Sequence, residues 1–305
     1  MAVTVGILMA TFNGARFLDE QLLSIERQSH ADWHLSVSDD GSTDATRYII
    51  EAFRCDHPGQ VEIVAGPGKG FAANFLSLVQ SPGVKADYWA FCDQDDHWYD
   101  DKLQRAVQWL DQAPATLPAL YCSRTRLIDA DGRSLGLSPD WSRTISFRNA
   151  LVQNIASGNT MVFNESARDL LSGFALVDAP FHDWLLYLVV TGCGGRVLFD
   201  HVPQVDYRQH GGNAMGPWGG AAAHWQRLKI VAGGTYGDWM EANLAALQGI
   251  EDRLSDETRE LMEQLKSKRK SSGFARVMQL RRVGVYHQSP VATLLLMAAA
   301  ISGKV

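Results

Sequence analysis

Short apolar segments alternate with amphipathic segments throughout the first half of the chain. The expected strands are residues 3–9, 34–38, 61–65, 88–92 and 119–122, and the expected helices are residues 15–28, 44–53, 71–79 and 99–110. Ser42 or Thr43 is expected to cap the second of these helices. Alternation of this kind predicts an α/β fold with a mostly parallel, doubly wound sheet flanked by helices.

Polar and glycine-rich sequences follow four of the expected strands. They read ATFNG from residue 10, SDDGSTD from residue 38, GPGKG from residue 66 and CDQDD from residue 92. In an open α/β sheet, ligands bind beside the carboxyl ends of the strands. The four loops therefore predict one ligand-binding crevice at a single edge of the sheet.

Three common uses of such a crevice lack their motifs here. The first strand is not followed by the GxGxxG sequence of dinucleotide-binding folds, and Lys69 is followed by Gly70 rather than by the Ser or Thr of a P-loop. A phosphatase that forms an aspartyl phosphate would carry its paired aspartates on the first strand, whereas here they follow the fourth. The net charge of −6 argues against general binding to nucleic acid.

Three carboxylates, Asp93, Asp95 and Asp96, follow the expected strand at residues 88–92. Two such charges roughly 4 Å apart repel by about 4 kcal/mol at an intermediate effective dielectric, so a cation would stabilise them. Oxygen ligands select a hard ion such as Mg²⁺ or Mn²⁺, and Mg²⁺ fills its other positions with water and substrate phosphates. The cluster thus predicts a site for a metal-bound diphosphate. The alternative is an acidic cap for the following helix, made by Asp95 or Asp96.

Asp39 and Asp40 follow the expected strand at residues 34–38. An aspartate at this position can accept a hydrogen bond from the N3–H group of uracil or thymine, and Gly41 allows the tight turn that exposes it. The residues leave open which aspartate does so. They are equally compatible with a simple turn that leads into helix-capping residues.

Several of these sequences together resemble a known family. GILMATFNGARFLDEQLLSIERQ, VSDDGSTDAT and CDQDDHWYDDKL are similar to family 2 glycosyltransferases of the GT-A fold. DQDDxW and YRQHGGN resemble bacterial rhamnosyltransferases that use dTDP-L-rhamnose in polysaccharide or lipopolysaccharide assembly. The resemblance covers about residues 3–216. It implies an inverting transfer of a sugar, with L-rhamnose expected, from a dTDP- or UDP-linked donor to a saccharide or lipid-linked acceptor.

The resemblance also implies roles for individual residues. Asp93 would lie on the ribose side of the donor, Asp95 would coordinate Mg²⁺ or Mn²⁺, and Asp96 is left open between metal binding and helix capping. Gly211 and Gly212 would form a hinge for closure over the donor. The other residues expected to contact the nucleotide or its diphosphate are Thr11, Phe12, Asn13, Glu20, Asp39, Asp40, Gly70, Asn74, Arg208 and His210.

Asp183, in the segment APFHDWLLYLVV, is the general base that the resemblance implies. Its charge would also stabilise the start of the following helix, which is the alternative explanation. The acceptor is expected near Asn159, His182 and Trp184. One displacement from the face opposite the nucleotide inverts the anomeric configuration. An ordinary aspartate pKa of about 3.9 would make the positioning of this base more important than its strength.

The C-terminal part of the chain has a different character. Periodic leucines between residues 244 and 265 predict two helices separated near Ser255, so residues 1–216 are expected to form the catalytic domain and residues 217–305 a helical region. Residues 264–305 contain eight Lys or Arg and no Asp or Glu; since the whole chain carries −6, the rest carries −14. The final apolar segment, about thirteen residues, is too short to cross a bilayer. Contact with a membrane surface is expected, and packing on the acidic domain or a homo-oligomer contact is the alternative.

Two further functions remain open from the residues alone. A metal-dependent sugar nucleotidyltransferase would use a similar open sheet and similar carboxylates, and a sugar-binding scaffold would need no base. Release of UDP or dTDP in the presence of an acceptor sugar would identify the transferase. The four cysteines show no CxxC spacing, and the first residues lack the basic region of a signal sequence, so a reducing, cytoplasmic location is expected.

Overall fold

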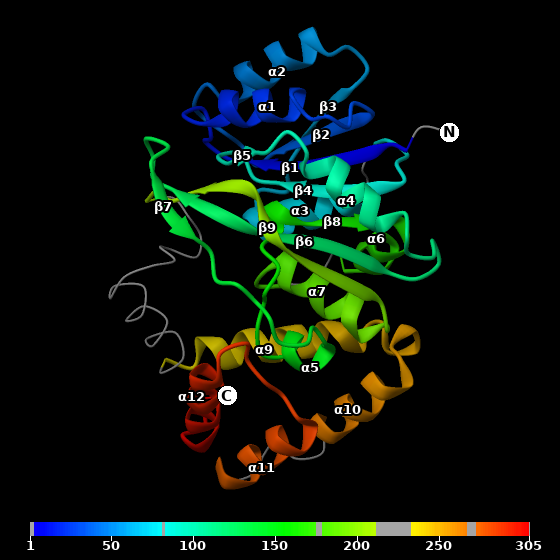
Figure 1. The fold of residues 1–305 in the computed structure, drawn as a ribbon, viewed down its shortest axis with the longest axis vertical. Helices are drawn as coiled ribbons and strands as arrows, with labels where there is room; N and C mark the ends of the chain where they lie inside the picture. Colours follow the sequence, from blue (N-terminus) through cyan, green and yellow to red (C-terminus); the bar gives the residue numbers. More distant parts are fainter. Residues whose placement is uncertain (1–2, 81–82, 175–178, 212–232, 267–272, 305) are drawn as a thin grey trace.

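The computed structural model describes residues 3–80, 83–174, 179–211, 233–266 and 273–304 (Figure 1). The strands are β1 (Val5–Thr11), β2 (Trp33–Asp39), β3 (Val61–Ala65), β4 (Tyr88–Cys92), β5 (His97–Trp98), β6 (Ala119–Ile128), β7 (Ser134–Leu137), β8 (Val162–Asn164) and β9 (Arg196–Arg208). The helices of the first part are α1 (Leu18–Glu26), α2 (Thr46–Asp56), α3 (Phe71–Gln80), α4 (Lys102–Leu110), α5 (Phe147–Ala150), the short 3₁₀ helix η1 (Gly158–Thr160), α6 (Glu165–Ser172) and α7 (His182–Gly192). Those of the last part are α9 (Thr235–Gln248), η2 (Glu251–Arg253), α10 (Asp256–Lys266), α11 (Gly273–Val283) and α12 (Pro290–Ile301).

One sheet organises the fold, in the order β3-β2-β1-β4-β8-β6-β9-β5, with β7 paired to β6. β3, β2, β1 and β4 are parallel, and Val5 of β1 lies opposite Trp33 of β2 and Tyr88 of β4. This half confirms the predicted doubly wound α/β arrangement. Beyond it, β8 is antiparallel to both β4 and β6, while β6 and β9 are parallel. The parallel half places the carboxyl ends of β1, β2 and β4 at one edge.

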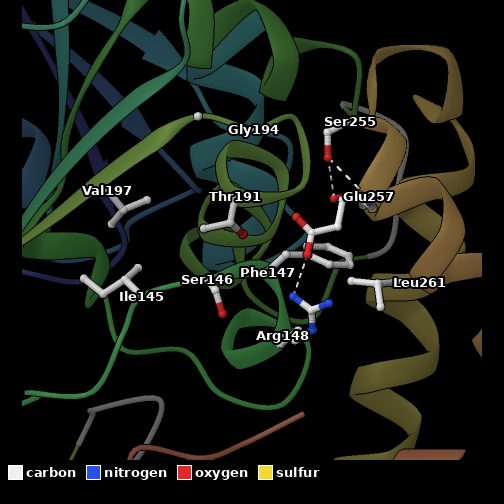
Figure 2. Close-up of a pocket in the computed structure, with 12 residues that line it drawn as sticks. Ile145, Ser146, Phe147, Arg148, Thr191, Gly194, Val197, Ser255, Glu257 and Leu261 are labelled. Carbon is white, nitrogen blue, oxygen red and sulfur yellow. Dashed lines mark hydrogen bonds and ion pairs between the residues drawn. The ribbon is translucent and has the colours of Figure 1, made fainter. Parts of the chain in front are cut away.

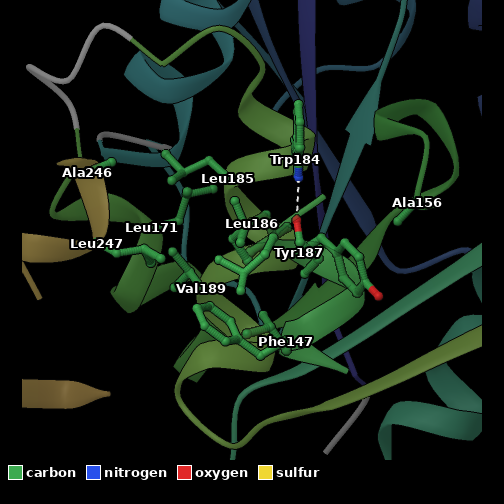
Figure 3. Close-up of a cluster of buried hydrophobic side chains, with 14 of the residues drawn as sticks. Phe147, Ala156, Leu171, Trp184, Leu185, Leu186, Tyr187, Val189, Ala246 and Leu247 are labelled. Atoms are coloured by element: carbon green, nitrogen blue, oxygen red, sulfur yellow. Dashed lines mark hydrogen bonds between the residues drawn. The ribbon is translucent and has the colours of Figure 1, made fainter. Parts of the chain in front are cut away.

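The two faces of β1 belong to two different hydrophobic cores. Val5, Ile7 and Met9 pack with residues of α1 and α4 on one face, because alternate side chains of a strand point to opposite faces. Leu8 points to the other face, where the core contains residues of α3, α6 and α7. α7 is apolar around most of its circumference, as expected for a helix enclosed on all sides (Figure 3).

The C-terminal helices continue the second of these cores. Leu247 of α9, Leu261 of α10, Leu280 of α11 and Leu296 of α12 belong to the same buried cluster as α7. Figure 1 shows these helices below α7, on the side away from α1 and α2. The domain boundary expected at residue 216 lies outside the described residues, and the division into two domains stays a prediction.

Two expectations about helix ends have different outcomes. The predicted cap of α2 by Ser42 or Thr43 is wrong: α2 follows Ala45, and the Ser42 hydroxyl instead accepts a hydrogen bond from the Asn13 N–H and donates one to Asp39. The predicted break near Ser255 is confirmed, because the Ser255 hydroxyl accepts a hydrogen bond from the backbone N–H of Thr258 at the start of α10.

A helix that crosses the hydrocarbon core of a bilayer needs about 20 predominantly apolar residues. Across the part of the chain that the structure describes, none combines the length and the hydropathy that a membrane span requires.

Candidate active site

A cavity of about 530 Å³ opens at the carboxyl ends of β1 and β4 and at the start of α7. Its walls come from seven separate segments of the chain, as expected at this edge of an open α/β sheet. The lining residues are Ala10, Thr11, Phe12, Asp40, Gly68, Gly70, Phe71, Asn74, Phe75, Asp93, Gln94, Asp95, Ser157, Gly158, Phe181, His182, Asp183 and Tyr207.

Gln94 ties the loop after β4 to the loop after β1. Its side-chain oxygen accepts a hydrogen bond from the Phe12 N–H at 2.9 Å, and its side-chain nitrogen donates one to the Phe12 carbonyl at 3.1 Å. Gly14 makes room for this amide, because a Cβ atom at Gly14 would lie 2.2 Å from the Gln94 side-chain oxygen. These hydrogen bonds fix the positions of the two loops relative to each other, and both loops line the cavity.

Asn13 and Asp40 tie the loops after β1, β2 and β3 in the same way. Asn13 has a left-handed backbone with φ of 49°, and its side-chain oxygen accepts a hydrogen bond from the Thr43 N–H at 2.9 Å. The Asp40 carboxylate accepts hydrogen bonds from the N–H groups of Gly68 at 2.6 Å and Gly70 at 3.0 Å. These bonds satisfy loop N–H groups that sheet and helix pairing leave over.

Asp39 and Asp40 are placed differently relative to the cavity. Asp40 lines it, whereas Asp39 is buried beside it and accepts hydrogen bonds from the hydroxyl of Thr11 at 3.2 Å and from the backbone N–H of Ser42 at 3.1 Å. Arg47 lies 3.8 Å from the Asp39 carboxylate. Recognition of a pyrimidine by either residue stays a prediction.

Asp93 and Asp95 both line the cavity, but their partners differ. The Asp95 carboxylate lies 2.6 Å from Nε2 of His210. Burial, together with the negative charges of Asp95 and Asp183, raises the pKa of Asp93 to about 8. Asp93 is therefore a carboxylate whose ionised form requires a compensating positive charge.

Asp96 neither begins a helix nor lines the cavity. It is fully buried, accepts a hydrogen bond from the Asn159 side-chain N–H, and accepts a second from the backbone N–H of Arg208 at 3.1 Å. α4 begins later, at Lys102, and Asp101, the residue before it, makes no side-chain capping hydrogen bond. The acidic-cap alternative is therefore wrong. Asp96 is instead a buried residue that links the loop after β4 to Asn159 and Arg208.

Arg208 binds the loop that follows β4. Its Nε donates to the Asp95 carbonyl at 3.0 Å, and its guanidinium forms a 2.6 Å ion pair with Glu20 of α1. The same guanidinium lies 4.7 Å from the centre of the Phe17 ring. The residue is 2 % exposed. Arg208 and Glu20 thus hold one another outside the cavity lining, and their contacts with a donor stay predictions.

Asp183 reaches the cavity from the first turn of α7. Its carboxylate accepts hydrogen bonds from the Trp184 N–H at 2.7 Å and from the Gly158 N–H at 3.1 Å. Burial nevertheless raises the pKa of Asp183 to about 6, well above the ordinary value expected from the sequence. A base with this pKa is better matched to proton transfer near neutral pH.

The expected acceptor residues occupy different depths. His182 lines the cavity; its ring stacks on Phe75 at 4.0 Å, and burial lowers its pKa to about 3. Among the described residues, neither of its ring nitrogens has a hydrogen-bond partner. Trp184 lies in the core, where its indole N–H donates to the Ala150 carbonyl at 2.7 Å (Figure 3). Asn159 does not line the cavity, and its side-chain N–H donates a hydrogen bond to Asp96.

A second cavity, of about 190 Å³, lies between α5, α7 and α10 (Figure 2). Arg148 and Glu257 form a 2.6 Å ion pair at its side, and the Ser255 hydroxyl faces Thr258. Its lining contains no cluster of carboxylates. We therefore assign the chemistry to the first cavity.

The residues around Asp93 suit a divalent cation. Asp93 and Asp95 offer two carboxylates, and Mg²⁺ in proteins commonly takes one or two carboxylates while substrate phosphates complete its coordination. Within the described residues, no three His, Cys, Asp or Glu side chains already form a complete ligand set. Asp93 and Asp95 would hold such an ion only together with ligands from the substrate or solvent.

Half of the residues that line the cavity were not predicted from the sequence. Gln94 lies inside the DQDD sequence, but an amide carries no charge signal that would distinguish it from a neutral spacer. Ala10 and Gly68 lie in the loops that predicted the crevice, and Ser157 and Gly158 lie in the segment 155–164 that the family resemblance placed at the sugar-binding cleft, but no local pattern singled these residues out. The remaining unpredicted lining residues are Phe71, Phe75, Phe181 and Tyr207. Gly212, the second residue of the predicted hinge, lies outside the described residues.

A sheet whose parallel half ends in paired aspartates after β4, with Asp183 lining the same cavity, favours a glycosyltransferase of the GT-A fold. Residues 6–170, more than half of the chain, match the model of Glycosyl transferase family 2. The chain is 32 % identical over 232 residues to the dTDP-rhamnosyl transferase RfbG of Shigella flexneri, covering 73 % of this chain and 78 % of that protein. The protein therefore belongs to glycosyl transferase family 2.

Solved structures support the same fold. S. aureus TarS residues 1–349 align with a TM-score of 0.57 at 14 % identity, covering 99 % of this chain and 89 % of that one. The mannosyltransferase PcManGT from Pyrobaculum calidifontis, in complex with GDP-Man and Mn²⁺, aligns with a TM-score of 0.54 at 19 % identity, covering 98 % and 85 %. At these identities the likeness concerns the GT-A fold.

Proposed function

We propose that this glycosyltransferase moves L-rhamnose from dTDP-L-rhamnose to a hydroxyl of a saccharide or lipid-linked acceptor, with inversion, in the assembly of bacterial cell-surface polysaccharide or lipopolysaccharide. One observation carries the reaction type: Asp183 and the Asp93–Asp95 pair line the same cavity. The relative from Shigella flexneri, named a dTDP-rhamnosyl transferase, favours rhamnose as the sugar and thymine as the nucleotide base.

In the proposed reaction, the donor diphosphate lies against Asp93 and Asp95, and the acceptor hydroxyl lies against Asp183. Asp183 accepts the hydroxyl proton while the acceptor oxygen bonds to the anomeric carbon and the bond to the diphosphate breaks. Mg²⁺ or Mn²⁺, held by Asp93 and Asp95, would stabilise the negative charge left on the diphosphate. A β-linked donor would give an α-linked product, since a single displacement inverts the configuration.

The chain's own groups prepare both partners for this step. The N–H groups of Gly158 and Trp184, together with the Asn154 side chain, orient the Asp183 carboxylate toward the position of the acceptor. On the donor side, Gln94 and Asn13 hold the nucleotide-facing loops in place. Fixed reacting groups lower the entropic cost of reaching the transition state.

Donor binding provides the first test. In a thermal-shift screen of UDP- and dTDP-linked sugars with Mg²⁺ or Mn²⁺, we expect dTDP-L-rhamnose with a metal to stabilise the protein most, because ligand binding to the folded state raises its melting temperature. Calorimetry should show that dTDP binds at least about tenfold more weakly with chelator or in the Asp93→Asn variant. Equal binding with and without chelator would rule out the proposed role of the metal.

Product analysis provides the second test. With dTDP-L-rhamnose and a mixture of candidate saccharide acceptors, we expect release of dTDP and an α-linked rhamnoside, which NMR would identify. Release of pyrophosphate from a nucleoside triphosphate and a sugar phosphate would instead indicate a nucleotidyltransferase, and binding without any turnover would indicate a scaffold.

A further inference from the structure

The outer face of α12 is apolar and uncovered. Val291, Leu294, Leu295 and Ile301 are 66 %, 68 %, 47 % and 63 % exposed, and their positions along the helix put them within about one third of its circumference. The opposite side, with Leu296, packs into the core. α12 therefore has apolar residues on both sides, and only one side is buried within the described part of the chain.

α11 extends this surface and adds positive charge. Phe274 and Met278 are 75 % and 51 % exposed, and Arg281 and Arg282, also exposed, follow at the spacing that continues the same helix face. α11 and α12 pack against each other. Residues 264–305 contain eight Lys or Arg and no Asp or Glu, in contrast to the net charge of −14 on the rest of the chain.

We infer that the exposed faces of α11 and α12 bind the surface of a bilayer that contains anionic phospholipids. Exposed apolar side chains beside arginines match the two parts of such a surface: acyl chains take up the apolar groups, and negative headgroups attract the guanidinium groups. α12 has 12 residues and is about 18 Å long, so it would lie in the interface rather than cross it. This inference is independent of the proposed sugar and acceptor.

The membrane-facing helices are connected to the wall of the active-site cavity. At the end of α12, the Lys304 side chain lies within 3.9 Å of the Cβ position of Gly234, immediately before α9. On α9, the Trp239 ring lies 4.9 Å from the ring of Phe181, which lines the cavity beside Asp183. Figure 1 shows α12 beside the first turn of α9. A bilayer bound to α12 would thus lie on the α9 side of the cavity, where an acceptor carried on a lipid would approach Asp183.

Vesicle flotation tests the inference directly with the full chain. We expect the protein to float with vesicles of phosphatidylcholine and phosphatidylglycerol, and to float far less with phosphatidylcholine alone. Leu294→Glu/Leu295→Glu should lower the apparent partition coefficient by at least about tenfold, since two leucines leave the acyl region. Arg281→Gln/Arg282→Gln should lower it by about thirtyfold on anionic vesicles, with little effect on neutral ones.

Leu135→Glu/Leu137→Glu on β7 is the matched control. These leucines are 57 % and 48 % exposed, close to the values on α12, and the charge change is identical. The control should float like the wild type, and thermal melts should show that both double variants are folded. Equal flotation of the α12 variant and the wild type would overturn the inference. So would a wild-type dimer, measured by light scattering, that the α12 variant converts to a monomer without any loss of flotation.

Discussion

The carboxylates around the cavity differ in what surrounds them. Asp96 is enclosed and hydrogen-bonded to Asn159, Asp95 is paired with His210, and Asp93 is surrounded by negative charge. Asp183 stands apart, held by two backbone N–H groups at the start of α7. Environments that push pKa values apart commonly mark different chemical roles.

Asp183→Asn should abolish turnover and stabilise the fold. Loss of a general base typically lowers kcat by about 10²–10⁴-fold, while donor affinity should change little. The pKa of Asp183 is raised from 3.8 to about 6 in the folded protein, so the folded state binds a proton more readily and loses stability as pH rises through this window. The neutral amide removes this cost, which is at most about 3 kcal/mol at pH 7.5. Melting temperatures and dTDP release measure the two effects.

Asp56→Asn, on the exposed side of α2, is the control for this substitution. It should change neither quantity. Turnover by Asp183→Asn at the wild-type rate would exclude Asp183 as the base.

The pH profile should report the same group. Asp183 accepts a proton only when ionised, so kcat should fall as pH decreases through the pKa of Asp183 at about 6, to about a tenth of its plateau at pH 5. The assay needs saturating metal and donor, because metal binding to Asp93 competes with its proton. A kcat that stays constant from pH 5 to pH 8 would contradict this assignment.

Among the structural elements, η1 and α7 form the contact that positions the base. A Cβ atom on Gly158 would lie 2.9 Å from the His182 ring and 3.4 Å from the Asp183 side chain. Gly158→Ala should therefore displace the start of α7 and lower kcat by at least about tenfold, since small errors in position cost large factors in rate.

Gly173→Ala, at the end of α6, provides the comparison. Its nearest contact would be 3.6 Å and its backbone is right-handed, so kcat should be unchanged and stability equal or slightly higher. Steady-state kinetics and thermal melts on both variants distinguish local displacement from a general effect of alanine. Equal kcat values for the two would show that the Gly158 contact does not position the base.

The sequence predicted the elements that local patterns define. β3 and β4 were predicted with their observed ends, and the loops after β1, β2, β3 and β4 do meet at one edge. Parallel pairing makes this convergence predictable, because successive strand ends lie on the same side. The sequence IASGNTMVFN, residues 155–164, predicted a strand where β8 lies, but the antiparallel position of β8 between β4 and β6 was not predicted, because its pairing partners lie far away in the sequence.

The limits at the site have a similar physical origin. Arg208 was expected to face phosphate because it is a cation in a glycine-rich segment, yet its ion pair with Glu20 joins positions separated by 188 residues. The raised pKa of Asp183 likewise depends on burial by the assembled fold, which residue type does not reveal. Charge and spacing identified candidate groups, and tertiary packing determined their environment.

At the scale of the whole molecule, the C-terminal helices are part of the core. Deletion of residues 273–305 should lower the melting temperature by more than about 10 °C, because Leu280 and Leu296 lose their burial and the core beneath α11 and α12 is uncovered. The deletion also removes the hydrogen bond from the Asn149 side chain to the Tyr286 carbonyl. Differential scanning fluorimetry measures the change.

A deletion of residues 303–305 alone removes only exposed positions among those described and should leave the melting temperature unchanged. If the longer deletion also left it unchanged, the C-terminal region would be an independent appendage rather than part of the core.

The side-chain hydrogen bonds of Gln94, Asn13 and Asp40 hold together the loops that are proposed to face the nucleotide. Those bonds join β-strand loops to one another and make no use of α7 or of the helices beyond it. The segments proposed to face the acceptor could thus be exchanged while the proposed binding of the nucleotide-linked sugar is retained. Libraries that redirect this enzyme toward new glycans should vary Ser157 and α9 while leaving Gly158 and the four tied loops intact.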